Sequence, residues 1–192
     1  MHILVLQHAV VEHPGIFRSF LVRDGHSYDA VELDEGAVLP ALDAYDALWV
    51  MGGPMDVWQE AAHPWLKLEK ALIQEAVQTR KMPFLGLCLG HQLLAEALGG
   101  RVGKSNVPEV GVMEVSLTAE GATANIFSDL PQQFQCLQWH SAEVTAMPTG
   151  AVCLAASAAC DVQAMQWGHA CVLGAIPYGI GARYSAQLGQ NS

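Results

Sequence analysis

Positively charged residues are scarce in this sequence of 192 residues, which has nine Lys and Arg against 19 Asp and Glu and a net charge of −10. A protein that binds nucleic acid through the phosphate backbone needs a basic surface, so the balance argues against that class of function. It argues equally against docking on an anionic membrane. No apolar run approaches the roughly 18 residues of a membrane-spanning helix, so we expect no membrane partner.

The sequence also lacks a cysteine or histidine pattern typical of cross-links or metal sites. Its five cysteines are irregularly spaced, and no C-x-x-C motif occurs. We therefore expect neither a disulfide framework nor a metal, and no other cofactor. The first residues have no basic segment and no long apolar run, so they do not resemble a secretory signal. Reduced thiols in a cytoplasmic protein are the simplest expectation.

What the chain does have is enough apolar sequence for a packed core. Hydrophobic residues make up 52% and charged residues 15%, which excludes an intrinsically disordered chain. A chain of this length buries about 70% of its unfolded surface. Because no linker, internal repeat or low-complexity tract is visible, residues 1–192 are predicted to form one domain.

Strand and helix patterns alternate in the first half of the sequence. Short apolar runs predict strands, and apolar residues every three or four positions predict helices. The expected strands are 3–6, 28–33, 47–51 and 84–87; the expected helices are 16–22, 65–77 and 91–98, the second with an apolar stripe at positions 65, 68, 72 and 76. This order predicts an α/β fold of three layers, an open, mostly parallel sheet with helices on both faces.

The second half shows short strand patterns separated by turns. These expected strands are 110–117, 135–139, 152–156, 162–167 and 171–176. They predict antiparallel hairpins added to the edge of the parallel sheet. If no helix covers the apolar segment 171–176, its exposed edge would favour a homodimer.

The most informative motif surrounds Cys88. A strand is expected to end at Leu87 and a helix to begin near Gly90, and Gly86 and Gly90 lie two residues on either side of the cysteine. This is the nucleophile-elbow pattern with cysteine in place of serine: the glycines avoid Cβ clashes, and the turn presents the side chain above the carboxyl ends of the strands. The helix N-terminus is expected to lower the pKa of the thiol. The competing interpretation, a buried unreactive cysteine, suits the other four cysteines better.

A second turn, Met51-Gly52-Gly53-Pro54, follows another expected parallel strand. A Gly-Gly turn at that place can direct backbone N–H groups at a developing oxyanion. The backbone N–H of Leu89, directly after the nucleophile, would be the other donor. By itself this turn is a weak signal, and its pairing with the elbow is what gives it meaning.

Together these residues resemble the class I glutamine amidotransferases. Gly86-Leu87-Cys88-Leu89-Gly90-His91-Gln92 is similar to the nucleophile motif of that family, and residues 51–54 are similar to its oxyanion turn. Weaker similarities occur at residues 99–102, 109–111 and 139–144. The resemblance runs over about residues 1–176 and is nearest to stand-alone proteins similar to the amidotransferase domain of GMP synthase. It implies the flavodoxin-like fold of the family.

The resemblance also implies a reaction and a site. In the family, a cysteine thiolate attacks the side-chain amide of glutamine and releases ammonia for a synthetase. Water then hydrolyses the γ-glutamyl thioester. By this resemblance Cys88 is the nucleophile, and Gly53 and Leu89 supply the oxyanion donors. The residues implied to bind glutamine are Gly52, Gln92, His140, Ser141 and Ala142, the last two through their backbone.

One part of the family pattern is missing. The last strand of the family reads approximately G-I-Q-[FY]-H-x-E, and here Gly179 stands in the histidine position and Gly181 in the glutamate position, with Pro177 in place of the glutamine. Residues 177–192 are therefore divergent, truncated or altered, and the helix expected after this strand is missing. A general acid–base contributes about 10²–10⁴-fold, so we expect little or no glutaminase activity.

Two other histidines lie close to the motifs. His140, with Glu143 nearby, is the best candidate for a substitute base, whereas His91 is expected to point along the elbow helix.

Three functions stay open at this point: an amidotransferase that supplies ammonia to a separate synthetase or acceptor enzyme, a non-catalytic glutamine-binding or regulatory module, and a γ-glutamyl cysteine hydrolase of related fold. The chain has no G-x-x-x-x-G-K-[ST] loop, so an ATP-using synthetase would be another protein.

Overall fold

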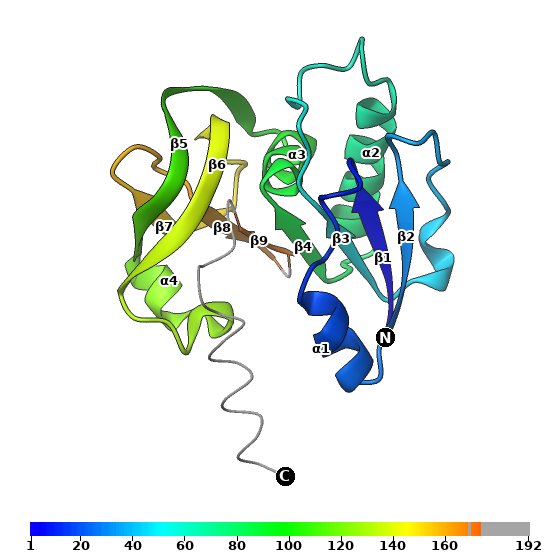
Figure 1. The fold of residues 1–192 in the computed structure, drawn as a ribbon, viewed down its shortest axis with the longest axis horizontal. Coiled ribbons are helices and arrows are strands. Elements are labelled where there is room, and N and C mark those ends of the chain that lie inside the picture. The colour runs from blue at the N-terminus through cyan, green and yellow to red at the C-terminus, as the bar shows by residue number, and fades with distance from the viewer. Residues whose placement is uncertain (169, 174–192) are drawn as a thin grey trace.

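The computed structural model describes residues 1–168 and 170–173, and its strands form one mixed sheet with helices on both faces (Figure 1). The strand order across the sheet is β2-β1-β3-β4-β9-β8-β7-β5-β6. The strands from β2 to β9 in this order run parallel to one another, and those from β9 to β6 pair antiparallel. The predicted α/β fold, with a parallel half and an antiparallel half, is confirmed.

The parallel half follows the sequence prediction closely. Its strands are β1 (His2–Gln7), β2 (Ser27–Glu32), β3 (Ala47–Val50) and β4 (Phe84–Leu87), and its helices are α1 (Phe17–Arg23), α2 (Trp65–Gln74) and α3 (Leu89–Ala97), with a short 3-10 turn at Leu42–Ala44. Side chains alternate between the faces of a strand, so β1 supplies two cores. Ile3 and Val5 belong to the core that contains Leu21 of α1, whereas Leu4 and Leu6 belong to the core under α2 and α3.

The buried face of α2 differs from the predicted stripe. Leu68, which the stripe placed in the core, is 64% exposed, and the buried residues are Leu66, Glu69 and Ile73. The chain continues beyond α2 as a π-helical turn, Glu75–Thr79. Hydropathy could not reveal this face because its centre is a carboxylate.

The antiparallel half contains β5 (Arg101–Leu117), β6 (Gln133–Ala146), β7 (Val152–Ser157) and β8 (Ala164–Trp167), with a short helix α4 (Ala119–Thr123) and a 3-10 turn, Asn125–Phe127, after β5. β5 and β6 are much longer than predicted and form a curved ribbon beside the parallel half (Figure 1). Their register shifts between Lys104 and Glu109, and Gly111 has a φ of 125°. The pattern was predicted in shorter pieces because these irregularities interrupt its alternation.

The last described strand, β9 (Ala170–Leu173), lies in the middle of the sheet. It pairs parallel with β4 and antiparallel with β8. The expectation that residues 171–176 form a free edge is therefore wrong for residues 171–173. These residues give no support for a homodimer formed through that edge. Residues 174–176, together with Pro177, Gly179 and Gly181, lie outside the described residues. Among the helices of the described part, none is long and apolar enough to span a membrane.

Candidate active site

Cys88 lies on the turn between β4 and α3, with φ of 50° and ψ of −101°. A positive φ is costly for any residue other than glycine, so this turn has the strained backbone of a nucleophile elbow. The neighbouring glycines are required by packing. A Cβ at Gly86 would lie 2.7 Å from the Gly90 carbonyl group, and a Cβ at Gly90 would overlap the carbonyl of Val50 in β3.

The Gly52–Gly53 turn follows β3 and touches the elbow. A Cβ at Gly53 would lie 2.7 Å from the Leu89 side chain, so the two residues expected to supply oxyanion donors are in contact. The backbone N–H of Leu89 lies close enough to the Cys88 sulfur to favour its ionised form. Gly52 is buried under the carboxylate of Glu12.

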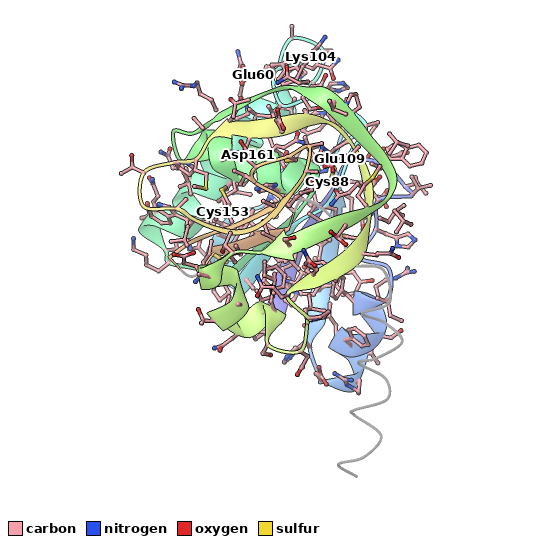
Figure 2. All side chains as sticks on the ribbon, turned by 90° about the vertical axis from the view of Figure 1, so that its left-hand side faces the viewer. Glu60, Cys88, Lys104, Glu109, Cys153 and Asp161 are labelled. Carbon is pink, nitrogen blue, oxygen red and sulfur yellow. The ribbon has the colours of Figure 1, made fainter. Side chains whose placement is uncertain are left out.

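A narrow cavity lies beside the elbow. Figure 2 shows Cys88 and Glu109 within the opening framed by the β5–β6 ribbon. The cavity is lined by Cys88, His91, Gln92, His140, Ala142, Glu143, Val144, Cys160, Val162 and Gln163. Its volume is about 10 Å³, room for one water at most, so glutamine enters only if the walls move.

The cavity brings together three of the five residues expected to bind glutamine. Gln92, His140 and Ala142 line it, and the Gln92 Nε2 atom donates to the Ala142 carbonyl at 3.2 Å. Ser141 has an exposed side chain, and Gly52 lies on the oxyanion turn and not in the cavity wall.

The thiol of Cys88 is less acidic than the sequence suggested. Burial and the negative charge of Glu12 raise the pKa of Cys88 to about 11, although the Leu89 N–H lowers it. The expected lowering by the helix N-terminus is therefore wrong, because desolvation of the thiolate outweighs it. At pH 7 a pKa of about 11 leaves roughly one thiol in 10⁴ ionised.

His140 has a different partner from the one expected. Its Nε2 atom lies 3.1 Å from the Oε2 atom of Glu109, a buried carboxylate, and not beside Glu143. Its Nδ1 atom lies 3.1 Å from the Ala142 carbonyl oxygen. The Nδ1 atom therefore faces a protein oxygen, whereas Nε2 lies beside the Glu109 carboxylate but makes no hydrogen bond within the described chain.

His91, which lies on α3, lines the cavity as well. Burial and the nearby His140 lower the pKa of His91 to about 4, and its Nε2 atom has no hydrogen-bond partner within the described chain. The pKa of Cys88 is raised and that of His91 is lowered, so both shifts oppose a proton transfer from the thiol to this imidazole. His91 is thus too weak a base for this thiol.

Glu109, His140 and Cys160 form a group whose potential metal-ligand atoms lie within 4.8 Å of one another. Sequence spacing could not reveal it, because Glu109 and His140 come from different strands and Cys160 from a loop. The group is explained without a metal: Ser157 Oγ donates to the Glu109 carboxylate at 2.8 Å, and Gln163 Nε2 donates to its other oxygen. We therefore assign no metal to these residues.

Comparison with known proteins identifies the family to which this chain belongs. Residues 17–174 match the family Glutamine amidotransferase class-I. The chain belongs to this family. One subunit of the glutamine-hydrolyzing GMP synthase of Sulfolobus acidocaldarius is 32% identical over 160 residues, which are 82% of this chain and 80% of that protein. A glutamine amidotransferase-like protein of Salmonella typhimurium is 29% identical over 173 residues, 88% of this chain and 72% of its own.

The fold agrees with the family. The crystal structure of a glutamine amidotransferase from Thermotoga maritima superposes with a TM-score of 0.85 at 26% identity, over 99% of this chain and 84% of that one. The amidotransferase resemblance seen in the sequence is confirmed. In this chain, the elbow and the Gly52–Gly53 turn are in contact at the carboxyl ends of adjacent parallel strands, where open α/β sheets bind their ligands.

Proposed function

We propose that this amidotransferase binds glutamine beside the β4–α3 elbow and that Cys88 attacks the side-chain amide. The sulfur forms a bond to the amide carbon, the carbon–nitrogen bond breaks, and the leaving nitrogen takes the thiol proton and departs as ammonia. The contact between Gly53 and Leu89 carries the proposal, because backbone N–H groups there would hold the oxygen of the tetrahedral intermediate.

In this proposal the reaction is slow. The Cys88 thiol is protonated at neutral pH because its pKa is about 11. Neither histidine of the described cavity wall makes a hydrogen bond to the Cys88 sulfur: the His140 ring lies beside the Glu109 carboxylate and the Ala142 carbonyl, and burial lowers the pKa of His91 to about 4. The sequence has Gly179 and Gly181 where the family carries its His-x-Glu pair. A missing general base costs about 10²–10⁴-fold.

Glutamine binding requires the cavity to open at the Gln92–Ala142 contact. In this proposal the Ala142 carbonyl exchanges its bond from Gln92 for one from the α-ammonium group of glutamine. An amide side chain and a carbonyl that already satisfy each other can be separated at little cost if the substrate supplies equivalent groups.

The ammonia acceptor is proposed to lie on a separate synthetase. Several relatives are named as single subunits of a GMP synthase, which implies a further subunit in those proteins. This chain carries no P-loop sequence of its own.

Protection of Cys88 from iodoacetamide tests glutamine binding. We expect glutamine, but not asparagine, to slow alkylation of Cys88 and to leave Cys153 unaffected. The variant Gln92→Ala should weaken this protection. Equal rates with and without glutamine would contradict the proposal. Protection with no release of ammonia at all would favour the non-catalytic binding module, and stronger protection by γ-glutamyl peptides, with release of glutamate, would favour a γ-glutamyl hydrolase.

A further inference from the structure

A fully buried ion pair lies behind the oxyanion turn. His8 directly follows β1 and Glu69 comes from α2, and both side chains are 0% exposed. The Nε2 atom of His8 lies 2.9 Å from the Oε1 atom of Glu69. The Trp65 ring stacks on the imidazole with 5.3 Å between the ring centroids.

The other ring nitrogen of His8 holds the oxyanion turn. Nδ1 lies 2.8 Å from the carbonyl oxygen of Gly52. The Gly52 carbonyl oxygen only accepts hydrogen bonds, so His8 donates to it from Nδ1; opposite an ionised Glu69, Nε2 donates as well and the ring is an imidazolium. Burial alone would lower the pKa of His8, but the charge and hydrogen bond of Glu69, the Gly52 carbonyl and the charge of Asp34 outweigh it and raise the pKa above its usual value.

A contribution to folding stability is a weak explanation for this pair. Its second carboxylate oxygen, Glu69 Oε2, is buried and has no hydrogen-bond partner among the described residues. Buried ion pairs are often no more stable than apolar side chains of similar size in the same place. The contact with Gly52 suggests what the pair does instead.

The Gly52 carbonyl and the Gly53 N–H belong to the same peptide group. The described chain contains no cis peptide bond, so in this planar trans group the C=O and N–H bonds point in opposite directions. Because the Gly52 oxygen is held by the imidazole, the Gly53 N–H points away from His8. It has no hydrogen-bond partner in the part of the chain that the structure describes. Two consecutive glycines would otherwise leave this peptide group free to rotate.

We propose that His8, held by Glu69, is a positioning residue that orients the Gly53 N–H as an oxyanion donor. The proposal rests on the proposed function, since it assigns a role in the same site. His8 acts through the Gly52–Gly53 peptide group and does not touch the substrate. Its positive charge also polarises that group and makes the N–H a stronger donor.

Two reagents that attack the same sulfur test this role. The γ-aldehyde analogue of glutamine adds reversibly to Cys88: a carbon–sulfur bond forms, the carbonyl double bond opens, and its oxygen takes the proton. That oxygen occupies the oxyanion position. Iodoacetamide instead forms a carbon–sulfur bond as iodide leaves, and no oxyanion develops. The ratio of aldehyde affinity to alkylation rate therefore isolates the oxyanion donor from the reactivity of the thiol.

The informative variant is His8→Leu/Glu69→Leu, which replaces the pair with apolar side chains. We expect aldehyde affinity to fall by about tenfold to a hundredfold, with the alkylation rate of Cys88 and the thermal unfolding temperature close to those of the parent. The variant His8→Asn/Glu69→Gln keeps an N–H donor near the position of Nδ1 and should restore most of the affinity.

Equal aldehyde affinity in the parent and the Leu/Leu variant would overturn the proposed role of His8 but not the proposed function. A parallel loss of affinity, alkylation rate and unfolding temperature would also overturn it, because the pair would then be structural. If the parent itself forms no aldehyde adduct at Cys88, both this role and the proposed function are overturned.

Discussion

Alkylation of Cys88 is predicted to depend on pH in a way that an ordinary cysteine does not. Only the thiolate is alkylated, so the rate follows the ionised fraction. With a pKa of about 11, that fraction at pH 7.5 is about 3 × 10⁻⁴, against about 10% for a thiol with the ordinary pKa of about 8.5. Cys88 should therefore react about 300-fold more slowly than a free thiol reference at this pH.

The assay is peptide-mapped alkylation by iodoacetamide between pH 6.5 and 9.5, with a small-molecule thiol in the same tube. The rate at Cys88 should rise about tenfold per pH unit over the whole range, whereas the reference levels off above its own pKa. The variant Cys88→Ser confirms the peptide assignment. A plateau at Cys88 below pH 9 would refute the reasoning, because it would show that the N-terminus of α3 outweighs burial and the charge of Glu12.

Three further predictions concern the surroundings of the site. Glu12→Gln removes a charge that raises the pKa of Cys88, so alkylation of Cys88 at pH 7.5 should accelerate roughly threefold to tenfold. The control Glu114→Gln changes an exposed carboxylate and should have no effect on this rate. An unchanged rate in Glu12→Gln would contradict the role of the Glu12 charge. Gly90→Ala places a Cβ on the Val50 carbonyl and should reduce the free energy of unfolding by about 2–4 kcal/mol in urea titrations, and a loss below about 1 kcal/mol would show that the elbow relaxes. His8→Leu alone leaves the Glu69 carboxylate buried without a partner and should reduce the free energy of unfolding by about 3–5 kcal/mol. In the parent, the raised pKa of His8 means that the folded state binds more protons than the unfolded state, so the free energy of unfolding should fall as pH rises above about 6.5. If the Leu/Leu double variant retains this slope, His8 is not its source.

The sequence predicted the elements that local chemistry determines. The glycines around Cys88 restrict that turn so strongly that strand, strained residue and helix could be predicted together. The aliphatic run at residues 3–6 identified a buried strand for a similar reason. Both depend on neighbouring residues alone.

The features that could not be predicted from the sequence depend on contacts between residues far apart in the chain. Hydropathy treats Glu69 as a surface residue, and only the position of His8 explains its burial. The pairing of His140 with Glu109 joins β6 and β5 across a shifted register, so the nearer Glu143 looked like the partner. The pKa of Cys88 was predicted with the wrong sign because the helix terminus is visible in the sequence, whereas burial and the approach of Glu12 are not.

Mass spectrometry after treatment with a chloroketone analogue of glutamine, with glutamine hydrolysis measured in parallel, tests the central claim most directly. The account predicts a single adduct on Cys88, absent in Cys88→Ala, and ammonia release from glutamine that is at least a hundredfold slower than expected for a complete general-base site. Rapid turnover would contradict the claim that the described cavity lacks a competent base. No adduct on Cys88 would contradict the claim that the elbow and the oxyanion turn form a glutamine site.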